Sequence, residues 1–210
     1  MRVVVFGATG GLGSASVQKA LAAGHRVTAF VRSPDKVRIR HDALALVQGD
    51  VLDGVAVARV MRDQDAVLSA LGPAAGTPAG TLISTGTRSI IDGMKSAGVR
   101  RFLFASGLMV GPAAGMNVFK RQLIKVFRVM HRDLYLDKLR AEASVRESGL
   151  DWIIVRPPVL ADVPARGRYR VGPDIDVRLM DKFAFADVAD YMVRGLSEDE
   201  FLHRAVELSY

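Results

Sequence analysis

The sequence predicts an α/β protein with a single Rossmann-type, doubly wound parallel sheet flanked by helices. Three observations predict this fold: short apolar runs recur along the chain, segments with helical periodicity alternate with them, and a glycine-rich turn follows the first run. The chain has 210 residues, of which 50% are hydrophobic and 24% charged, so it can build a core. At about 150 residues per domain, we expect residues 1–210 to form one domain.

Strands are expected where four to six apolar residues follow one another, because strands covered on both faces need no polar alternation. These runs are residues 3–6, 27–31, 44–47, 66–70, 102–105 and 152–155. Apolar residues at helical spacing predict helices between strands, as in residues 83–94, with Gly98 as a stop, and near the C-terminus in residues 185–196. This alternation predicts βαβ units with right-handed crossovers.

A basic segment departs from this rhythm. Residues 116–140 hold seven lysines and arginines against two aspartates, which accounts for five of the seven net positive charges. Apolar residues recur in it at helical spacing: Met116, Phe119, Leu123, Phe127 and Met130. We expect a basic helical insert at about residues 108–135. Its apolar stripe packs on the sheet, covers a ligand site as a lid, or binds a membrane surface or a partner.

Several classes of protein are disfavoured. The chain has no cysteine and four scattered histidines, so we expect no disulfide, iron–sulfur cluster, cysteine nucleophile or metal site. No sequence motif for nucleic-acid recognition accompanies the positive charge, and we therefore expect no nucleic-acid partner. The N-terminus lacks signal-peptide features, and glycines and prolines interrupt the uncharged residues 66–87. We therefore expect a cytoplasmic protein without stable membrane insertion.

The strongest motif is a glycine-rich turn between the first apolar run and a helical segment. In a dinucleotide fingerprint, glycines allow a tight turn and a close approach to pyrophosphate, and the helix N-terminus supplies amides and a positive dipole. No Lys-Ser or Lys-Thr pair follows, so the turn is not a P-loop. The candidate cofactor-binding residues here are Gly7, Thr9, Gly10, Gly11, Leu12 and Gly13.

The residues after the second run favour NADPH over NADH. An NAD-specific site usually has Asp or Glu at this point, on the ribose 2′-hydroxyl. This chain has Arg32 and Ser33, with Lys36 close behind. A guanidinium is a planar fork for phosphate, so these residues suit a 2′-phosphate. The plainer alternative is that Arg32 is a surface cation.

Further motifs extend over nearly the whole chain: Gly49-Asp50-Val51-Leu52, Ala70-Leu71-Gly72, Phe102-Leu103-Phe104-Ala105-Ser106, Arg156-Pro157-Pro158 and Phe185-Ala186-Asp187-Val188-Ala189. Together with the glycine turn, they resemble the atypical short-chain dehydrogenases. The resemblance is greatest to the NAD(P)H-binding, NmrA-like group that includes biliverdin reductase B, also called flavin reductase. It implies that Asp50 and Val51 flank adenine, Leu71 and Gly72 pass along the ribose, and Ser106 and Pro157 border the nicotinamide. As plainer alternatives, Asp50 is a turn residue and Pro157 a strand terminator.

The chain departs from the catalytic motif of classical short-chain dehydrogenases. Their Tyr-x-x-x-Lys relays a proton through a tyrosine hydroxyl. Here Tyr135 and Lys138 are only three residues apart, so they form a makeshift pair on one helix face or are surface residues. Ser106 orients the nicotinamide or the acceptor by a hydrogen bond, or is a small strand-end residue satisfied by the backbone. Lys138 and Val159 lie where biliverdin reductase B has pocket histidines.

The function we expect is an NADPH-dependent oxidoreductase that transfers hydride to a planar acceptor, such as a flavin, a quinone or a tetrapyrrole-like molecule. The acceptor pocket is expected between the loop of residues 72–80 and the insert of residues 111–135. We also expect a small C-terminal substrate-side region. Two alternatives stay open: a non-catalytic, NADP(H)-sensing regulator of NmrA-like type, and a small-ketone or nucleotide-sugar reductase or epimerase. The protein is expected to be a monomer or a homodimer.

Overall fold

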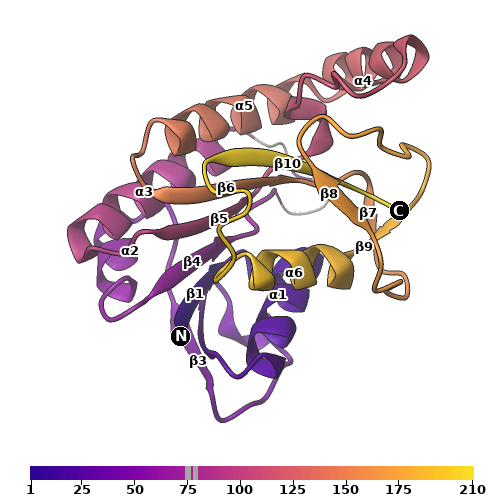
Figure 1. Cartoon of the computed structure of the whole chain (residues 1–210). Coiled ribbons are helices and arrows are strands. Elements are labelled where there is room, and N and C mark those ends of the chain that lie inside the picture. Colours follow the sequence, from indigo (N-terminus) through magenta and orange to yellow (C-terminus); the bar gives the residue numbers. More distant parts are fainter. Residues whose placement is uncertain (74–76, 78–79) are drawn as a thin grey trace.

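The computed structural model describes residues 1–73, 77 and 80–210 of the chain. Its central sheet has, within this part, eight strands in the order β3-β2-β1-β4-β5-β6-β10-β8 (Figure 1). They are β1 (Arg2–Phe6), β2 (Arg26–Val31), β3 (Leu44–Gln48), β4 (Ala66–Ser69), β5 (Arg101–Ala105), β6 (Asp151–Arg156), β8 (Arg170–Gly172) and β10 (Arg204–Ser209). Neighbouring strands are parallel except that β8 runs antiparallel to β10. The predicted Rossmann-type sheet is confirmed. Strands β7 (Leu160–Ala161) and β9 (Phe183–Ala184) form a small second sheet.

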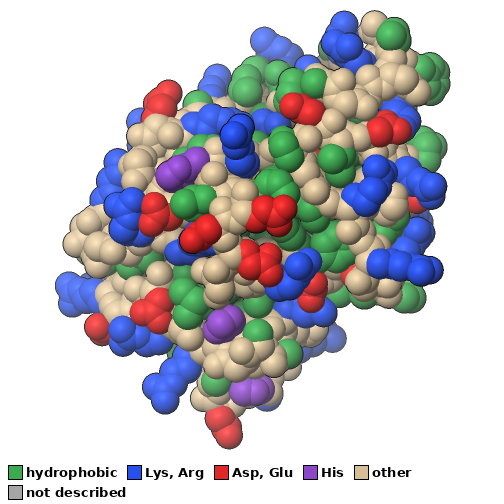
Figure 2. Space-filling view, in the orientation of Figure 1, with side chains coloured by type: hydrophobic (Ala, Val, Ile, Leu, Met, Phe, Trp, Pro, Cys, Tyr) green, Lys and Arg blue, Asp and Glu red, His purple; other side chains and the backbone are tan. Residues whose placement is uncertain are grey.

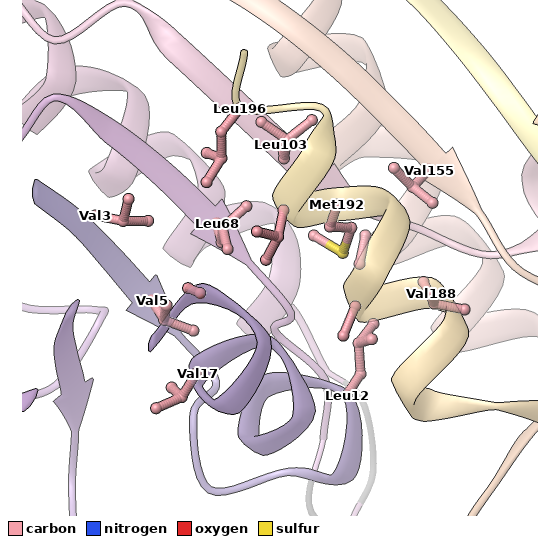
Figure 3. Packing of buried hydrophobic residues seen from close by; sticks show 14 of the residues in the cluster. Val3, Val5, Leu12, Val17, Leu68, Leu103, Val155, Val188, Met192 and Leu196 are labelled. Carbon is pink, nitrogen blue, oxygen red and sulfur yellow. The ribbon is translucent and has the colours of Figure 1, made fainter. Parts of the chain in front are cut away.

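Helices cover both faces of the sheet. Helices α1 (Gly11–Ala22) and α6 (Phe185–Arg194) pack together on one face, and α2 (Gly54–Val60), α3 (Leu82–Ala97) and α5 (Arg132–Arg146) cover the other (Figure 1). Each strand contributes alternate residues to the two cores. In β1, Val3 and Val5 face the α1 and α6 side (Figure 3). Val4 and Phe6 belong to the core on the other side. The four consecutive apolar residues of β1, from Val3 to Phe6, are therefore all buried.

One predicted strand has different surroundings. We expected residues 44–47 to be buried on both faces, but this is wrong for β3, in which Ala45 and Leu46 are exposed. Strand β3 is at the edge of the sheet and, among the described residues, pairs only with β2. An apolar run shows that a strand forms but does not show how far the helices extend over it.

Helix α3 begins with a cap from another helix. Its own N-cap residue, Thr81, makes no side-chain cap hydrogen bond. Instead, the buried carboxylate of Asp137 in α5 accepts hydrogen bonds from the Ile83 amide at 2.8 Å and the Ser84 amide at 3.0 Å. Free amides at a helix start need acceptors, and a carboxylate also interacts well with the helix dipole. This contact ties α5 to α3 and fixes the residues next to Asp137.

The basic insert forms two separate helices after a short 3₁₀ helix, η2 (Leu108–Val110). Helix α4 (Val118–Met130) starts where the Asn117 side chain accepts a hydrogen bond from the Lys120 amide, and α5 follows after His131. Of the three alternatives for the apolar stripe, packing on the sheet is wrong for α4: Phe119 is 77% exposed and Met130 is 70% exposed. Helices α3 and α5 already cover that face, and α4 extends beyond them (Figure 1).

The Asp137 contact predicts a large effect on stability. Replacing Asp137 with Ala leaves two amides at the start of α3 without their acceptor, so the free energy of unfolding should fall by about 2 kcal/mol. Asp137→Asn keeps one acceptor oxygen and should lose less. Urea unfolding followed by circular dichroism measures both variants. Equal stability of Asp137→Ala and the wild type would contradict the capping role.

Candidate functional site

The candidate cofactor-binding residues lie at one edge of the sheet. In parallel strands, the carboxyl ends meet at the same edge, and ligands of open α/β sheets bind there, where the strand order reverses. That reversal lies between β1 and β4. The residues follow successive strands: Gly7 follows β1, Arg32 follows β2, Asp50 follows β3, Leu71 follows β4, Ser106 follows β5 and Pro157 follows β6.

Two glycines of the turn are required by the fold. Gly7 has a φ of +78°, and a Cβ there would lie 2.4 Å from the Ala70 carbonyl oxygen. A Cβ on Gly13 would lie 2.0 Å from the Gly7 carbonyl oxygen. The absence of these side chains lets α1 start directly against β1 and β4, with its N-terminus at the edge where the strands end.

Gly10 is different, because the fold does not require a glycine there. Its φ is −82°, and a Cβ would meet only the Gly7 oxygen, at 3.4 Å. Gly10, Thr9 and Gly11 are exposed, and the first turn of α1 has no acidic residue. The open backbone and the positive end of the helix fit a pyrophosphate group that approaches closely.

The end of β2 brings Arg32 to the same edge. Phe30 pairs with Phe6 in the register of β1 and β2, so the residues after both strands are neighbours. Arg32 is exposed and has no ion pair within the described part of the chain. Ser33 follows it, and Lys36 is exposed at the end of the 3₁₀ helix η1 (Pro34–Lys36).

Val51 and Leu71 meet over the start of α3. A Cβ on Gly86 would lie 2.9 Å from Val51 Cγ1 and 3.1 Å from Leu71 Cδ1, so a glycine in the helix makes room for both side chains. The carboxylate of Asp50 accepts a hydrogen bond from the Leu52 amide at 2.9 Å, which is the contact of a turn residue. Gly72 is exposed next to Leu71.

A largely apolar cavity of about 640 Å³ lies at the ends of β5 and β6. It is lined by Ser106, Gly107, Leu108, Met109, Leu123, Ile124, Phe127, Lys138, Pro157, Pro158, Val159, Leu160, Leu179, Met180 and Lys182. Helix α4 of the insert therefore contributes to it. None of the described residues of the 72–80 loop lines the cavity, and residues 74–76 and 78–79 of that loop lie outside the described residues.

Lys138 lies in this cavity beside the end of β5. Its Nζ donates a hydrogen bond to the Ser106 carbonyl oxygen at 2.6 Å and lies 3.2 Å from where a Cβ on Gly107 would be. Burial lowers the pKa of Lys138 to about 8, although the negative charges of Glu142 and Asp137 act to raise it. Its ammonium group can therefore give up a proton close to neutral pH.

Glu142 does not form an ion pair with Lys138, because it is held by two arginines. This fully buried carboxylate accepts hydrogen bonds from Arg156 Nε at 3.0 Å, from an Arg156 terminal nitrogen at 2.7 Å and from Arg146 at 2.7 Å. Burial alone would raise the pKa of Glu142, but these hydrogen bonds keep it below its usual value. The Ser106 hydroxyl also interacts with Glu142 and contributes to this shift, although it makes no hydrogen bond of ordinary geometry within the described structure.

The structure brings Ser106, Lys138 and Pro157 together and leaves Tyr135 outside the cavity lining. The Ser106 amide bonds to the Val155 carbonyl at 2.8 Å, which joins the ends of β5 and β6. Tyr135 lies instead under Arg128, whose guanidinium carbon is 5.2 Å from the ring centroid. Within the described residues, no hydrogen bond joins Tyr135 to Lys138, whose Nζ bonds to the Ser106 carbonyl oxygen instead.

Several lining residues could not be found from the sequence. Leu179, Met180 and Lys182 come from an irregular segment between β8 and β9, which shows no periodicity. Glu142 had a weak signal, since it lies four residues after Lys138 and so on the same helix face. Its partner, Arg156, belongs to the Arg156-Pro157-Pro158 motif, but no sequence spacing indicates that Arg156 and Glu142 meet.

The fold and the glycine turn define a nucleotide-binding protein of the Rossmann class. The sequence pattern of the NAD(P)H-binding family matches residues 7–199, and the chain belongs to that family. An uncharacterized chloroplastic protein of Arabidopsis thaliana is 29% identical over 99% of this chain and 76% of its own length. The resemblance to atypical short-chain dehydrogenases is thereby confirmed at the level of the family and its nicotinamide cofactor.

Solved structures share the whole fold. The oxidoreductase YlbE of Lactococcus lactis has a TM-score of 0.82 at 19% identity, with 100% of this chain and 90% of that chain covered. ChuY, an anaerobilin reductase of Escherichia coli O157:H7, has a TM-score of 0.81 at 22% identity, with 100% and 97% covered. Within the described residues, no helix is both long enough and apolar enough to cross a bilayer.

The open position at Gly10 predicts a selective loss of nucleotide binding. In Gly10→Val, the added side chain fits the backbone but occupies the approach of the pyrophosphate, so affinity for NADPH should fall at least about tenfold. The midpoint of thermal unfolding should not change, and Gly10→Ala should be intermediate in affinity. Titration calorimetry measures binding; wild-type affinity in Gly10→Val would refute this role of the turn.

The position of Arg32 predicts that the protein binds NADPH more tightly than NADH. Arg32→Glu replaces a phosphate-binding fork with a repelling carboxylate, so the ratio of NADPH to NADH affinity should fall by about ten- to a hundredfold. Arg62→Glu makes the same charge change at an exposed residue after α2 and serves as the control. If both variants change the ratio equally, overall charge rather than Arg32 sets the preference.

Proposed function

We propose that this protein is an NADPH-dependent oxidoreductase that transfers hydride to a planar acceptor in the cavity at the ends of β5 and β6. The single observation that carries the proposal is Lys138, a lysine with a lowered pKa in an apolar cavity next to the nucleotide edge. Sites with one tuned proton donor among apolar walls are typical of enzymes rather than of structural clefts.

The residues at the sheet edge fit the cofactor. The Gly7–Gly13 turn would hold the pyrophosphate, Arg32 with Ser33 and Lys36 the 2′-phosphate, and Val51 and Leu71 the adenosine. Ser106 and Pro157, at the neighbouring ends of β5 and β6, would border the nicotinamide, which supplies the hydride when bound.

The cavity suits a flat, largely apolar acceptor. Leu123 and Phe127 from α4 face it from one side, and Pro158 and Met180 also line it. The described lining contains two lysines and no carboxylate, which favours an acceptor that carries or develops negative charge. Flavins, quinones and tetrapyrroles meet these requirements, and the likeness to ChuY, which is an anaerobilin reductase, supports a tetrapyrrole-like acceptor among them.

Lys138 would supply the proton. Hydride transfer to a conjugated acceptor leaves negative charge on an oxygen or nitrogen, and a nearby acid must neutralise it. With a pKa of about 8, the Lys138 Nζ is mostly protonated at neutral pH and is a stronger acid than an ordinary lysine. The hydrogen bond to the Ser106 carbonyl oxygen fixes the direction of the Nζ group.

One observation favours a second candidate function. Tyr135 lies outside the described cavity lining, so the proton relay of classical short-chain dehydrogenases is missing. A non-catalytic regulator that senses NADP(H) would keep the nucleotide site and need no such relay.

An assay of absorbance at 340 nm separates the two candidates. Purified protein is mixed with NADPH or NADH and with oxidised flavin mononucleotide, a short-chain quinone or biliverdin, while cofactor binding is measured by calorimetry. Turnover that prefers NADPH supports the oxidoreductase. Tight NADPH binding without turnover of any of the three acceptors would favour the sensor.

Lys138 predicts the pH dependence of turnover. The protonated form is the acid, so the turnover number should decrease as the pH rises through about 8. Lys138→Met should lower turnover about a hundredfold and abolish this decrease. Lys182→Met removes the exposed lysine of the same cavity and should keep the pH profile. An unchanged profile in Lys138→Met would exclude Lys138 as the proton donor.

A further inference from the structure

The outer surface of α4 is apolar. Five of its apolar side chains are more than half exposed: Val118, Phe119, Val126, Val129 and Met130. At 3.6 residues per turn, these positions lie next to one another around the helix and form a continuous strip along it. We call these five residues the α4 strip. A strip of this kind on a monomer indicates a surface that something else covers.

The α4 strip has a cationic border. Helix α4 has four lysines and arginines and no acidic residue. Two of them, Arg121 and Lys125, are exposed on the side of the helix next to Val118 and Val129, and form no ion pair within the described residues. In Figure 2, blue side chains lie beside green ones at the upper right of the molecule, where Figure 1 has α4.

The other two cations fasten α4 to the body of the protein. Lys120 forms an ion pair with Asp176 at 2.6 Å. Arg128 donates hydrogen bonds to the carbonyl oxygens of Met109, at 2.7 Å, and Gly111. The α4 strip is therefore held in a defined orientation relative to the cavity.

The opposite border of the α4 strip is the mouth of the cavity. Leu123 and Phe127 line the cavity and are also 38% and 40% exposed. Two further lining residues, Val159 and Met180, are 54% and 87% exposed. Apolar surface therefore runs from the outside of α4 to the opening of the proposed acceptor site.

We propose that α4 docks this protein on the surface of a membrane that contains anionic lipids. The α4 strip would enter the boundary between headgroups and acyl chains, while Arg121 and Lys125 contact lipid phosphates. The charge favours lipid over a second copy of the chain, because a symmetric dimer through α4 would bring two acid-free cationic helices together. In this arrangement α4 lies in the membrane interface and does not cross the bilayer.

The docked orientation has a consequence for the acceptor, which rests on the proposed function. The cavity mouth would lie at the lipid surface, so an acceptor with a planar head and a long aliphatic tail could enter while its tail stays in the bilayer. A tail of this kind would contact the exposed faces of Leu123, Phe127 and Met180 at the mouth. We therefore assign the acceptor to the class of lipid-borne planar molecules, such as tailed quinones.

Co-sedimentation of the full-length protein with vesicles tests the docking. Vesicles of phosphatidylcholine with phosphatidylglycerol should bind the protein at least tenfold more tightly than vesicles of phosphatidylcholine alone. The triple variant Phe119→Ser, Val129→Ser, Met130→Ser and the charge variant Arg121→Glu, Lys125→Glu should each lose at least tenfold. The control variant Leu52→Ser, Val55→Ser removes exposed apolar residues near the start of α2 and should bind like the wild type.

The outcomes separate the alternatives. Equal binding to both kinds of vesicle, no binding, or wild-type binding by the triple variant would overturn the docking. The docking would also be overturned if the wild type sediments as a dimer and the triple variant as a monomer, because the α4 strip would then be a subunit interface. All variants are first compared by thermal unfolding, because these exposed substitutions should not change the fold.

The acceptor class is tested separately. Wild type and the triple variant should reduce a water-soluble short-chain quinone at equal rates, because none of the three substituted residues lines the cavity. A long-tailed quinone in anionic vesicles should be reduced at least tenfold faster by the wild type. Equal rates on the tailed quinone would overturn this acceptor class, and so would reduction of flavin mononucleotide or biliverdin but of neither quinone. No reduction of any of these acceptors, with docking intact, would contradict the proposed function and leave the docking in place.

Discussion

The position of α5 depends on two buried carboxylates, and much of the site depends on α5. Asp137 accepts two amides at the start of α3, and Glu142, one turn further along, accepts three hydrogen bonds from Arg156 and Arg146. A buried carboxylate without such partners would be very costly, so the helix has one well-defined place on the sheet. That place puts Lys138 against the end of β5.

The same two contacts set the chemistry of Lys138. Both neighbouring carboxylates are already hydrogen-bonded to other groups, so neither forms an ion pair with the lysine in the described structure. Desolvation then outweighs their attraction and lowers the pKa of Lys138. A structural network and the proposed proton donor are therefore parts of one arrangement, in which the charges of Asp137 and Glu142 are satisfied away from the cavity.

The two ends of the site differ in character. The nucleotide edge consists of backbone amides, glycines and exposed cations, which suit phosphate groups. The cavity is lined mainly by apolar side chains from β-strand ends, α4 and the segment before β9. The apolar character continues outside the cavity along α4, while the α1 turn is polar and open. A hydrophilic cofactor and a hydrophobic acceptor could thus reach the same point from different sides.

Local sequence determined the strands, the glycine turn and the extent of α3, because neighbouring residues encode each of them. Apolar runs encode the strands, glycines that leave no room for a Cβ encode the turn, and Gly98 with its positive φ ends α3. It also determined which residues follow each strand and therefore share an edge. Only the tertiary structure decided what covers each face. It left β3 and α4 exposed, and it placed Tyr135 outside the cavity lining. It also brought Asp137 to the start of α3 and Glu142 to Arg156, which no local pattern indicates. Periodicity shows which residues share a face, but it carries no information about which element packs against that face.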